Sequence, residues 1–234
     1  MDMKPFTPKD NESHPPLIYP PYKSSTSRSP SKDPIIVPQT ISELTGPTFD
    51  HSELPEHSTD LTMNGRKTGE PLGERIIVTG RILDENGDPV PNAMVEIWQA
   101  NSAGRYIDSE DHHQAPLDPN FLGAGRMLTD KDGWYRFLTL RPGAYPWGNH
   151  PNAWRPPHIH FSIFGANIMT RLVTQMYFEG DPLLQYDPIC ASASEEARVR
   201  MIADFSLEHT EEGFALGYLW DIVIRGPKAT PFED

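Results

Sequence analysis

A run of prolines just before a pair of histidines constrains this chain more than any other stretch. The sixteen residues from Tyr145 to His160 include four prolines. Each proline lacks a backbone N–H and favours extended geometry in the residue before it. A helix is therefore excluded from Tyr145 to Pro157, and we expect an ordered or semi-ordered loop there.

The loop is followed by a strictly alternating segment, His158–Phe164, with the sequence His-Ile-His-Phe-Ser-Ile-Phe. Successive side chains of a β-strand point to opposite faces of the sheet. The pattern predicts a strand that places His158 and His160 side by side on one face. The opposite face is apolar and is expected to pack against the core; it consists of Ile159, Phe161 and Ile163.

Two imidazoles on one strand face indicate either a metal site or a solvated surface, and an isolated His-x-His pair is more often solvated. Here the flank rich in aromatic residues and proline, together with the nearby Arg155, favours a metal site. The sequence has no His-Glu-x-x-His motif, and its single cysteine, Cys190, excludes a thiolate zinc site. A cupin-like site would need a glutamate shortly after the histidines, and residues 161–166 contain none.

A carboxylate from a His-x-Glu pair is a further alternative ligand. Two such pairs, His51-Ser52-Glu53 and His209-Thr210-Glu211, lie in polar sequence without periodicity, and we interpret both as solvated. The hard, charge-neutralising ligand that remains is a tyrosine phenolate. A phenol has a pKa of about 10, so it ionises at neutral pH only when a strong Lewis acid binds it.

Length and charge limit the classes of protein that this chain can belong to. Its 234 residues can bury one sizeable core, and its net charge of −13 argues against binding to nucleic acid or anionic membranes. The sequence shows no secretory h-region and no apolar run of membrane-spanning length. Because one cysteine also allows no internal disulfide, we expect a cytoplasmic protein.

The first 70 residues differ from the rest of the chain in composition and periodicity. They are rich in proline, serine and threonine and show no sustained period of 2 or 3.6, so they cannot build a core alone. A disordered tail is one interpretation. The aromatic, proline-rich patch Pro15–Tyr22 favours another, an extended arm over residues 1–70 that docks on the chain's own domain, residues 71–234, or on a partner. Residues 40–44 are expected to add one helical turn.

Several short alternating runs separated by turn residues predict a mainly β domain, a sandwich or barrel. Asn86-Gly87 is a strong turn signal, and we expect a β-hairpin between Arg75–Leu83 and Ala93–Trp98. One short helix is expected over Ser192–Ala203, with Ser192 and Glu195 as its capping box. Further strand-like runs are Gly125–Thr129, Trp134–Leu140, Leu172–Phe178 and Leu216–Ile224.

Four blocks of the sequence closely resemble the intradiol ring-cleavage dioxygenases in order and spacing. They are Gly80–Ala93, Val95–Tyr106, Arg141–Tyr145 and Arg155–His160. The resemblance covers roughly residues 70 to 226 and also the proline-rich arm. It implies a mixed-topology β-sandwich that follows the N-terminal arm in the sequence. It also implies an Fe(III) ion held by two tyrosinates and two neutral imidazoles. The implied ligands are Tyr106, Tyr145, His158 and His160.

The resemblance also implies the roles of residues around the metal. Tyr145 would be the ligand that the substrate displaces, and Arg155 would stabilise negative charge that develops beside the iron. Tyr22 would hydrogen-bond a substrate carboxylate. The remaining implied pocket residues are Trp147, Gln175 and Ile189.

The same resemblance implies a substrate, a partner and a pathway. The substrate would be a small aromatic dihydroxy acid that is cleaved with O2 in the β-ketoadipate pathway, and the partner would be a homologous α chain in a hetero-oligomer. One alternative is an intradiol enzyme for catechol or hydroxyquinol, although those chains have a helical N-terminal segment that the arm lacks. Another alternative is a non-catalytic β-sandwich subunit, which would lack the four ligands.

Overall fold

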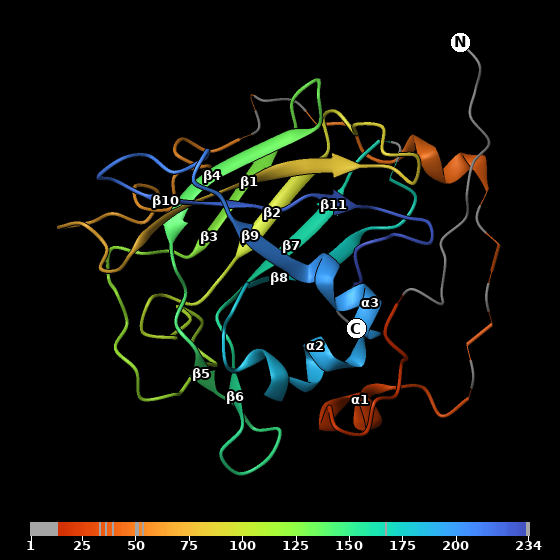
Figure 1. The fold of residues 1–234 in the computed structure, drawn as a ribbon, viewed down its shortest axis with the longest axis horizontal. Coiled ribbons are helices and arrows are strands. Elements are labelled where there is room, and N and C mark those ends of the chain that lie inside the picture. Colours follow the sequence, from red (N-terminus) through yellow and green to blue (C-terminus); the bar gives the residue numbers. More distant parts are fainter. Residues whose placement is uncertain are drawn as a thin grey trace.

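The computed structural model describes residues 14–232, apart from 33, 36, 39, 50, 51, 53 and 167. Most of the regular structure is β-sheet (Figure 1), so the mainly β prediction is confirmed. The strands are β1 (Arg75–Leu83), β2 (Met94–Trp98), β3 (Ala124–Leu128), β4 (Trp134–Leu140), β5 (Tyr145–Pro146), β6 (Trp154–Arg155), β7 (His158–Phe164), β8 (Leu172–Phe178), β9 (Ile202–Phe205), β10 (Leu216–Leu219) and β11 (Ile222–Val223). The α-helices are α1 (Lys23–Arg28), α2 (Pro188–Ser192) and α3 (Glu195–Arg198), and the 3-10 helices are η1 (Ile41–Thr45), η3 (Leu184–Tyr186) and η4 (Val199–Met201).

The main sheet is a long path of mixed topology that folds back over itself. Its strand order is β11-β1-β10-β9-β8-β7-β2-β3, and β4 pairs with β1. The pairs β1–β10, β1–β11 and β8–β9 are parallel, while the other pairs along the path are antiparallel. The two layers face each other, because Phe161 on β7 lies in ring contact with Tyr135 and Phe137 on β4. The mixed-topology sandwich is therefore observed.

The hairpin expected between β1 and β2 is wrong. The turn itself forms, since Asp84 N donates to Asp88 O and Val90 N donates to Ile82 O, each at 2.9 Å. Pro89 and Pro91 then supply no N–H to continue a ladder. The chain crosses to the other layer, where β2 pairs with β3 and β7, while β1 pairs with β4, β10 and β11. The turn joins two sheet layers instead of two adjacent strands.

The helix expected over Ser192–Ala203 is also wrong in its bounds. Ser194, not Ser192, is the N-cap, and its hydroxyl accepts from Ala197 N. The Ser192 hydroxyl instead donates to Ile189 O at the end of α2. Within the expected range the helical stretch therefore begins at Glu195 as α3 and continues as η4 to Met201, and the chain enters β9 at Ile202. The turn expected over 40–44 forms as η1, with Thr40 and Glu43 in a capping box.

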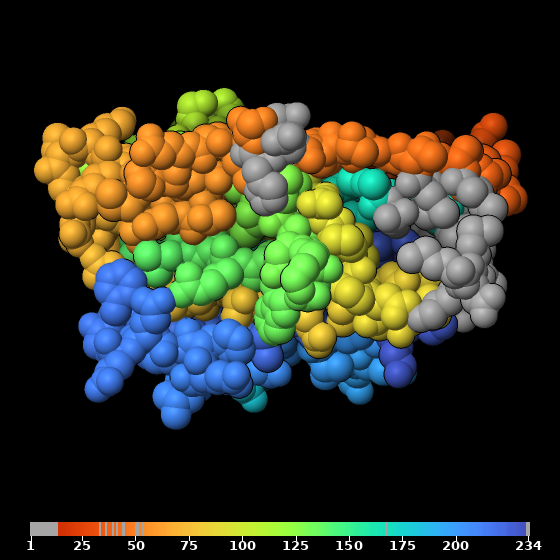
Figure 2. Space-filling model, turned by 90° about the horizontal axis from the view of Figure 1, so that it is seen from above, coloured from red at the N-terminus to blue at the C-terminus, as the bar shows by residue number. Residues whose placement is uncertain are grey.

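Figure 1 shows α1, α2, β5 and β6 gathered at one end of the strands. Figure 2 shows the chain that precedes β1, coloured red to orange, along one edge of the molecule. Helix α1 is joined to the loop between β5 and β6 by Asn149, whose Nδ2 donates to Pro21 O at 2.9 Å and whose Oδ1 accepts from Lys23 N at 2.8 Å. None of the helices in the described part of the chain is long and apolar enough to cross a bilayer.

Candidate metal centre

His158 and His160 lie side by side on β7 and are buried. Their rings are 4.9 Å apart, and only 2% and 8% of their surfaces are exposed. On the opposite face of the strand, Ile159, Phe161 and Ile163 are fully buried in the core, as the alternating pattern predicts. Because both histidines are buried, the solvated-surface interpretation does not apply to them.

Two phenols reach the histidines from separate segments, Tyr145 from β5 and Tyr106 from the loop after β2. Tyr145 Oη lies 3.2 Å from His158 Nε2, and Tyr106 Oη lies 3.2 Å from His160 Nε2. The two tyrosine rings are in edge contact, with centroids 5.5 Å apart. Two donor atoms that each lie about 2 Å from one metal ion are themselves about 3 Å apart, so both pairs have the spacing of neighbouring ligands in one coordination shell.

Two glycines allow the tyrosine loops to cross. Gly104 has a φ of 80°, and a Cβ on it would lie 2.2 Å from Ala144 O. A Cβ on Gly143 would lie 2.5 Å from Ser102 O. Larger residues would push the two backbones apart, so these glycines permit the close approach that brings Tyr106 and Tyr145 together. The Asn101 side chain adds to this geometry by accepting hydrogen bonds from Ala103 N and Arg105 N.

The surroundings restrain both imidazole rings, and for His158 they also determine which nitrogen could bind a metal. His158 Nδ1 lies 2.7 Å from Pro156 O, to which it can donate only if it carries the proton, and Nε2 is then free to act as a ligand. Burial lowers the pKa of His158 well below its ordinary value, and Arg155 and His160 lower it further, so the ring is neutral. Trp98 stacks on the His160 ring at 4.7 Å with an interplanar angle of 4°, which fixes its orientation.

The chemistry of the site depends on the phenols. Within the described ranges, no group of three or more His, Cys, Asp and Glu side chains could hold a metal ion. Of the two His-x-Glu pairs in the sequence, His51 and Glu53 lie outside the described residues. His209 Nδ1 instead lies 2.8 Å from Ser206 Oγ, away from the β7 histidines. Two imidazoles and two potential phenolates fit a trivalent ion such as ferric iron, because the phenolate charges offset most of the metal charge.

Arg155 is buried beside the two histidines at the end of β6. Its guanidinium donates to Asp187 Oδ2 from Nε at 3.3 Å and from Nη2 at 3.1 Å, and Nη2 also donates to Tyr177 Oη at 3.1 Å and to Gln175 Oε1. Burial opposes the charged form, but Tyr177, Asp187 and Tyr145 outweigh it and raise the pKa of Arg155. The site therefore contains a permanent positive charge that solvent barely reaches.

Of the other predicted pocket residues, Trp147 and Gln175 contact this arginine. Trp147 stacks over the Arg155 guanidinium at 5.5 Å, and its ring is 5.7 Å from that of Tyr22. Gln175 is fully buried on β8. Gln175 Nε2 and Trp147 Nε1 are buried donors without an acceptor among the described residues. Ile189 is not in that cluster; it lines a small cavity between α1 and α2 together with Tyr22.

Sequence reasoning missed four residues that hold this site in place: Asn149, Asp187, Tyr177 and Asp111. Asn149 joins the arm to the β5–β6 loop, and Asp111 Oδ2 accepts from Tyr106 N at 2.9 Å. Asp187-Pro188 is a recognisable helix start, with an N-cap acceptor before proline at the first helical position. That signal predicts the local turn and contains nothing about the contact of Asp187 with Arg155.

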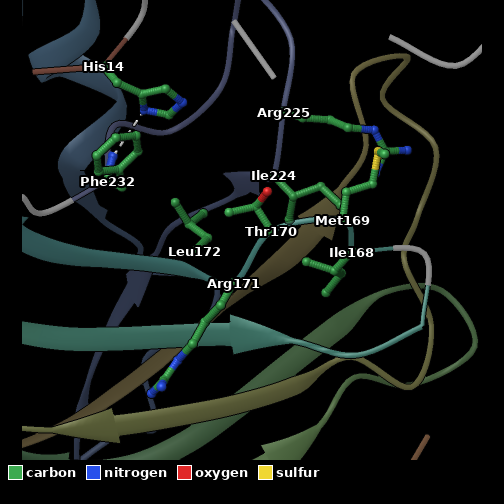
Figure 3. A pocket seen from close by; sticks show the side chains of 9 residues that line it. All are labelled: His14, Ile168, Met169, Thr170, Arg171, Leu172, Ile224, Arg225 and Phe232. Carbon is green, nitrogen blue, oxygen red and sulfur yellow. Dashed lines mark hydrogen bonds between the residues drawn. The ribbon is translucent and has the colours of Figure 1, made fainter. Parts of the chain in front are cut away.

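A second cavity lies elsewhere, where the described ends of the chain meet (Figure 3). Phe232 N donates to His14 Nδ1 at 3.3 Å, and the two rings are 4.1 Å apart. Figure 3 shows Arg171 pointing away from this pair. None of the predicted site residues lines this cavity, and the part of the lining that is apolar includes Ile168, Leu172 and Ile224.

Comparisons with known proteins match almost the whole chain. The profile of a family described as "Dioxygenase" matches residues 44–226, and that of the "Protocatechuate 3,4-dioxygenase beta subunit N terminal" matches residues 7–40. The protocatechuate 3,4-dioxygenase beta chain of Burkholderia cepacia is 60% identical over 97% of both chains. The alpha chain from the same organism is 28% identical over 84% of this chain and 97% of its own length. The crystal structure of 3-chlorocatechol 1,2-dioxygenase from Rhodococcus opacus 1CP covers 76% of this chain and 70% of its own, at 25% identity and a TM-score of 0.56.

Proposed function

This chain belongs to the intradiol ring-cleavage dioxygenase family, and from that membership we propose that it cleaves protocatechuate (3,4-dihydroxybenzoate) with O2 to 3-carboxy-cis,cis-muconate. The reaction balances, because both atoms of O2 enter the product and the ring bond between the two hydroxylated carbons breaks. The observation that carries the proposal is the pairing of each buried histidine with a phenol at 3.2 Å, in a chain that matches a protocatechuate 3,4-dioxygenase beta chain over nearly its full length.

Tyr106, Tyr145, His158 and His160 would hold the metal, and the family is iron-dependent. A ferric ion in this site would supply Lewis-acid activation of the two adjacent ring hydroxyls for reaction with O2. His158 and His160 lie on the buried strand β7, and Tyr106 N donates to Asp111 Oδ2, so these three residues would remain in place during turnover. Tyr145 lies in the two-residue strand β5 of the proline-rich loop, and its phenolate would move away and accept a substrate proton at Oη.

Arg155 would stabilise the negative charge that develops on the substrate. Arg155 is 3% exposed, and Asp187, Tyr177 and Gln175 hold its guanidinium in a fixed position. A preorganised charge in a site that water barely reaches stabilises a transition state more strongly than the same charge in water.

The remaining pocket residues would orient the acid. We assign to the Tyr22 hydroxyl a hydrogen bond to the substrate carboxylate, because the arm brings its ring against Trp147 at the rim of the site. Trp147 Nε1 and Gln175 Nε2 are buried donors that await an acceptor, and oxygens of a bound substrate can supply one. Ile189 would form part of the apolar wall where α2 meets the arm.

The working enzyme would pair this chain with a homologous α chain. A protocatechuate 3,4-dioxygenase alpha chain is itself 28% identical to this chain, so both subunits would share one fold. Large apolar side chains that are exposed on the isolated chain, such as Leu72 (78%) and Leu117 (52%), provide surface for such a contact.

The test combines metal analysis, spectroscopy and turnover on protein that is co-expressed with its α chain. We expect iron as the bound metal and a red-brown colour, because charge transfer from tyrosinate to Fe(III) absorbs visible light. O2 consumption should require protocatechuate and yield a ring-opened tricarboxylic acid. A colourless, metal-replete and fully active preparation would exclude the tyrosinate site. A preference for catechol or hydroxyquinol over protocatechuate would exclude the proposed substrate, and an iron-free, inactive protein would indicate a non-catalytic subunit.

A further inference from the structure

We propose that Asp187 is a positioning residue for the proposed reaction, in which one carboxylate oxygen fixes Arg155 and the other fixes the start of α2. The inference rests on the proposed function, since it concerns how Arg155 is held beside the reacting substrate. Asp187 is fully buried and lies 32 positions beyond Arg155 in the sequence. A buried carboxylate is retained only where hydrogen bonds and an opposite charge compensate for its desolvation.

The Oδ2 atom of Asp187 joins three donors into one cluster. It accepts from Arg155 Nε and Nη2 and from Tyr177 Oη at 3.0 Å. Tyr177 Oη is also 2.9 Å from Gln175 Oε1, which in turn accepts from Arg155 Nη2. Each member of the cluster thus contacts at least two others, and all four side chains are nearly or completely buried. Such a closed network holds a side chain in one geometry more firmly than a single ion pair does.

The network occupies only part of the guanidinium. Nε and Nη2 of Arg155 are used by Asp187, Gln175 and Tyr177, whereas no acceptor among the described residues takes a hydrogen bond from Nη1. Trp147 covers a face of the same group. Asp187 therefore determines which nitrogen of Arg155 is left to meet negative charge on the substrate.

The Oδ1 atom of Asp187 links this network to the arm side of the pocket. It accepts from Ile189 N at 3.2 Å and so caps α2, which begins with Pro188. Ile189, the next residue, lines the cavity shared with Tyr22. One carboxylate thus contacts both Arg155 and the start of α2, so a substitution that keeps one oxygen can disturb the first contact and preserve the second.

The informative variant is Asp187→Asn, which keeps the side-chain size and one oxygen for the α2 cap. Its amide would place a donor against the Arg155 guanidinium in place of the carboxylate, so the arginine should shift. Removing one preorganised donor to a developing charge slows a reaction by about 100- to 1,000-fold, and displacing that donor should cost somewhat less, about 10- to 100-fold in kcat. Iron content, the visible absorption band and the Kd for protocatechuate measured without O2 should stay within about twofold, because none of the proposed iron ligands contacts Asp187.

Two control variants separate this role from ordinary stabilisation. Ser194→Ala removes the cap of α3, which accepts from Ala197 N, without touching Arg155. Asp221→Asn removes a carboxylate that pairs with Arg81, Oδ2 to Nη2 at 3.0 Å, outside the site. Both controls should keep wild-type kcat. If either slows turnover as much as Asp187→Asn does, the effect is a general loss of stability and the proposal is wrong.

A double-variant cycle provides a readout that a purely structural role would not change. If Asp187 acts through Arg155, then Arg155→Gln combined with Asp187→Asn should be no slower than Arg155→Gln alone. Multiplied losses in kcat would mean that Asp187 acts independently of Arg155, which overturns the proposal. If Asp187→Asn fails to fold, Tyr177→Phe removes one donor to Oδ2 and leaves the charge in place; it should lower kcat without changing Kd, and an unchanged kcat would also overturn the proposal. An inactive wild-type protein refutes the proposed function, whereas an active wild type with an unaffected Asp187→Asn variant refutes only this inference.

Discussion

The arm should undock from the pocket when Asn149 is replaced by alanine. Asn149 is buried in the β5–β6 loop, and its side chain accepts from Lys23 N at 2.8 Å and donates to Pro21 O at 2.9 Å. The two hydrogen bonds flank Tyr22, whose ring lies against Trp147. The Asn149→Ala variant removes both bonds, so Lys23 N and Pro21 O would hydrogen-bond with water instead.

The magnitude follows from the number of bonds lost. A hydrogen bond contributes about 0.5 to 1.5 kcal/mol net, so two contribute about 1 to 3 kcal/mol, which corresponds to about a 5- to 150-fold larger undocked population. Cleavage by trypsin after Lys23 and Arg28 should accelerate by that factor, because proteolysis follows the open population when opening and closing are fast. The KM for protocatechuate should rise while kcat changes little, since Tyr22 is assigned to substrate binding.

Thr26→Ala is the matched control for this experiment. The Thr26 hydroxyl is exposed on α1 and donates only to Lys23 O within the same helix. This variant should leave both the trypsin rate and KM at wild-type values. If Asn149→Ala is cleaved no faster than Thr26→Ala, or if it lowers kcat at an unchanged KM, the assignment of Asn149 as the anchor of the arm is refuted.

Two further predictions concern reactivity and assembly. Burial raises the pKa of the Cys190 thiol to about 12, and the negative charge of Asp187 contributes to this shift. Iodoacetamide at pH 8 should therefore label the denatured chain and leave the native protein unmodified. Rapid labelling of the native protein would contradict this. The chain expressed alone should be poorly soluble or weakly active, because large apolar side chains such as Leu72 and Leu207 are 78% and 77% exposed. Size-exclusion chromatography and activity assays with and without an α chain test this prediction. A stable, fully active monomer would contradict it.

Local patterns predicted the strands well and their partners poorly. Period-2 alternation defined β7 and β8 with the observed bounds, because the pattern records which face of a strand is buried. The Asn86-Gly87 turn was equally clear, yet β1 and β2 pair in different layers. Turn chemistry specifies how the chain reverses over a few residues, whereas pairing depends on partners as distant as β10, which no local signal identifies.

The sequence likewise predicted only some residues of the candidate site. The pair on β7 was recognisable from spacing alone, and the two tyrosines from the family resemblance. Asp187 was not, because its contact with Arg155 spans 32 positions and its local sequence indicates only a helix start. The burial of His158 and His160 also needed the structure, since the sandwich encloses both faces of β7 and an alternating pattern usually indicates one solvated face.

The two proposed ligand types should respond differently to substitution at Tyr145 and His160. Tyr145 lies in a two-residue strand of the proline loop, whereas His160 is fixed on β7 between the Trp98 ring and a fully buried neighbour, Phe161. Tyr145→Phe should keep iron through the other three residues but slow turnover by about 100-fold or more, because the departing phenolate no longer accepts the substrate proton. His160→Ala should lose iron, since a ligand that stays in place throughout cannot be replaced by its surroundings. Iron analysis and stopped-flow substrate binding on both variants decide the matter: if Tyr145→Phe loses iron as completely as His160→Ala, or turns over at the wild-type rate, then Tyr145 is not the ligand that the substrate displaces.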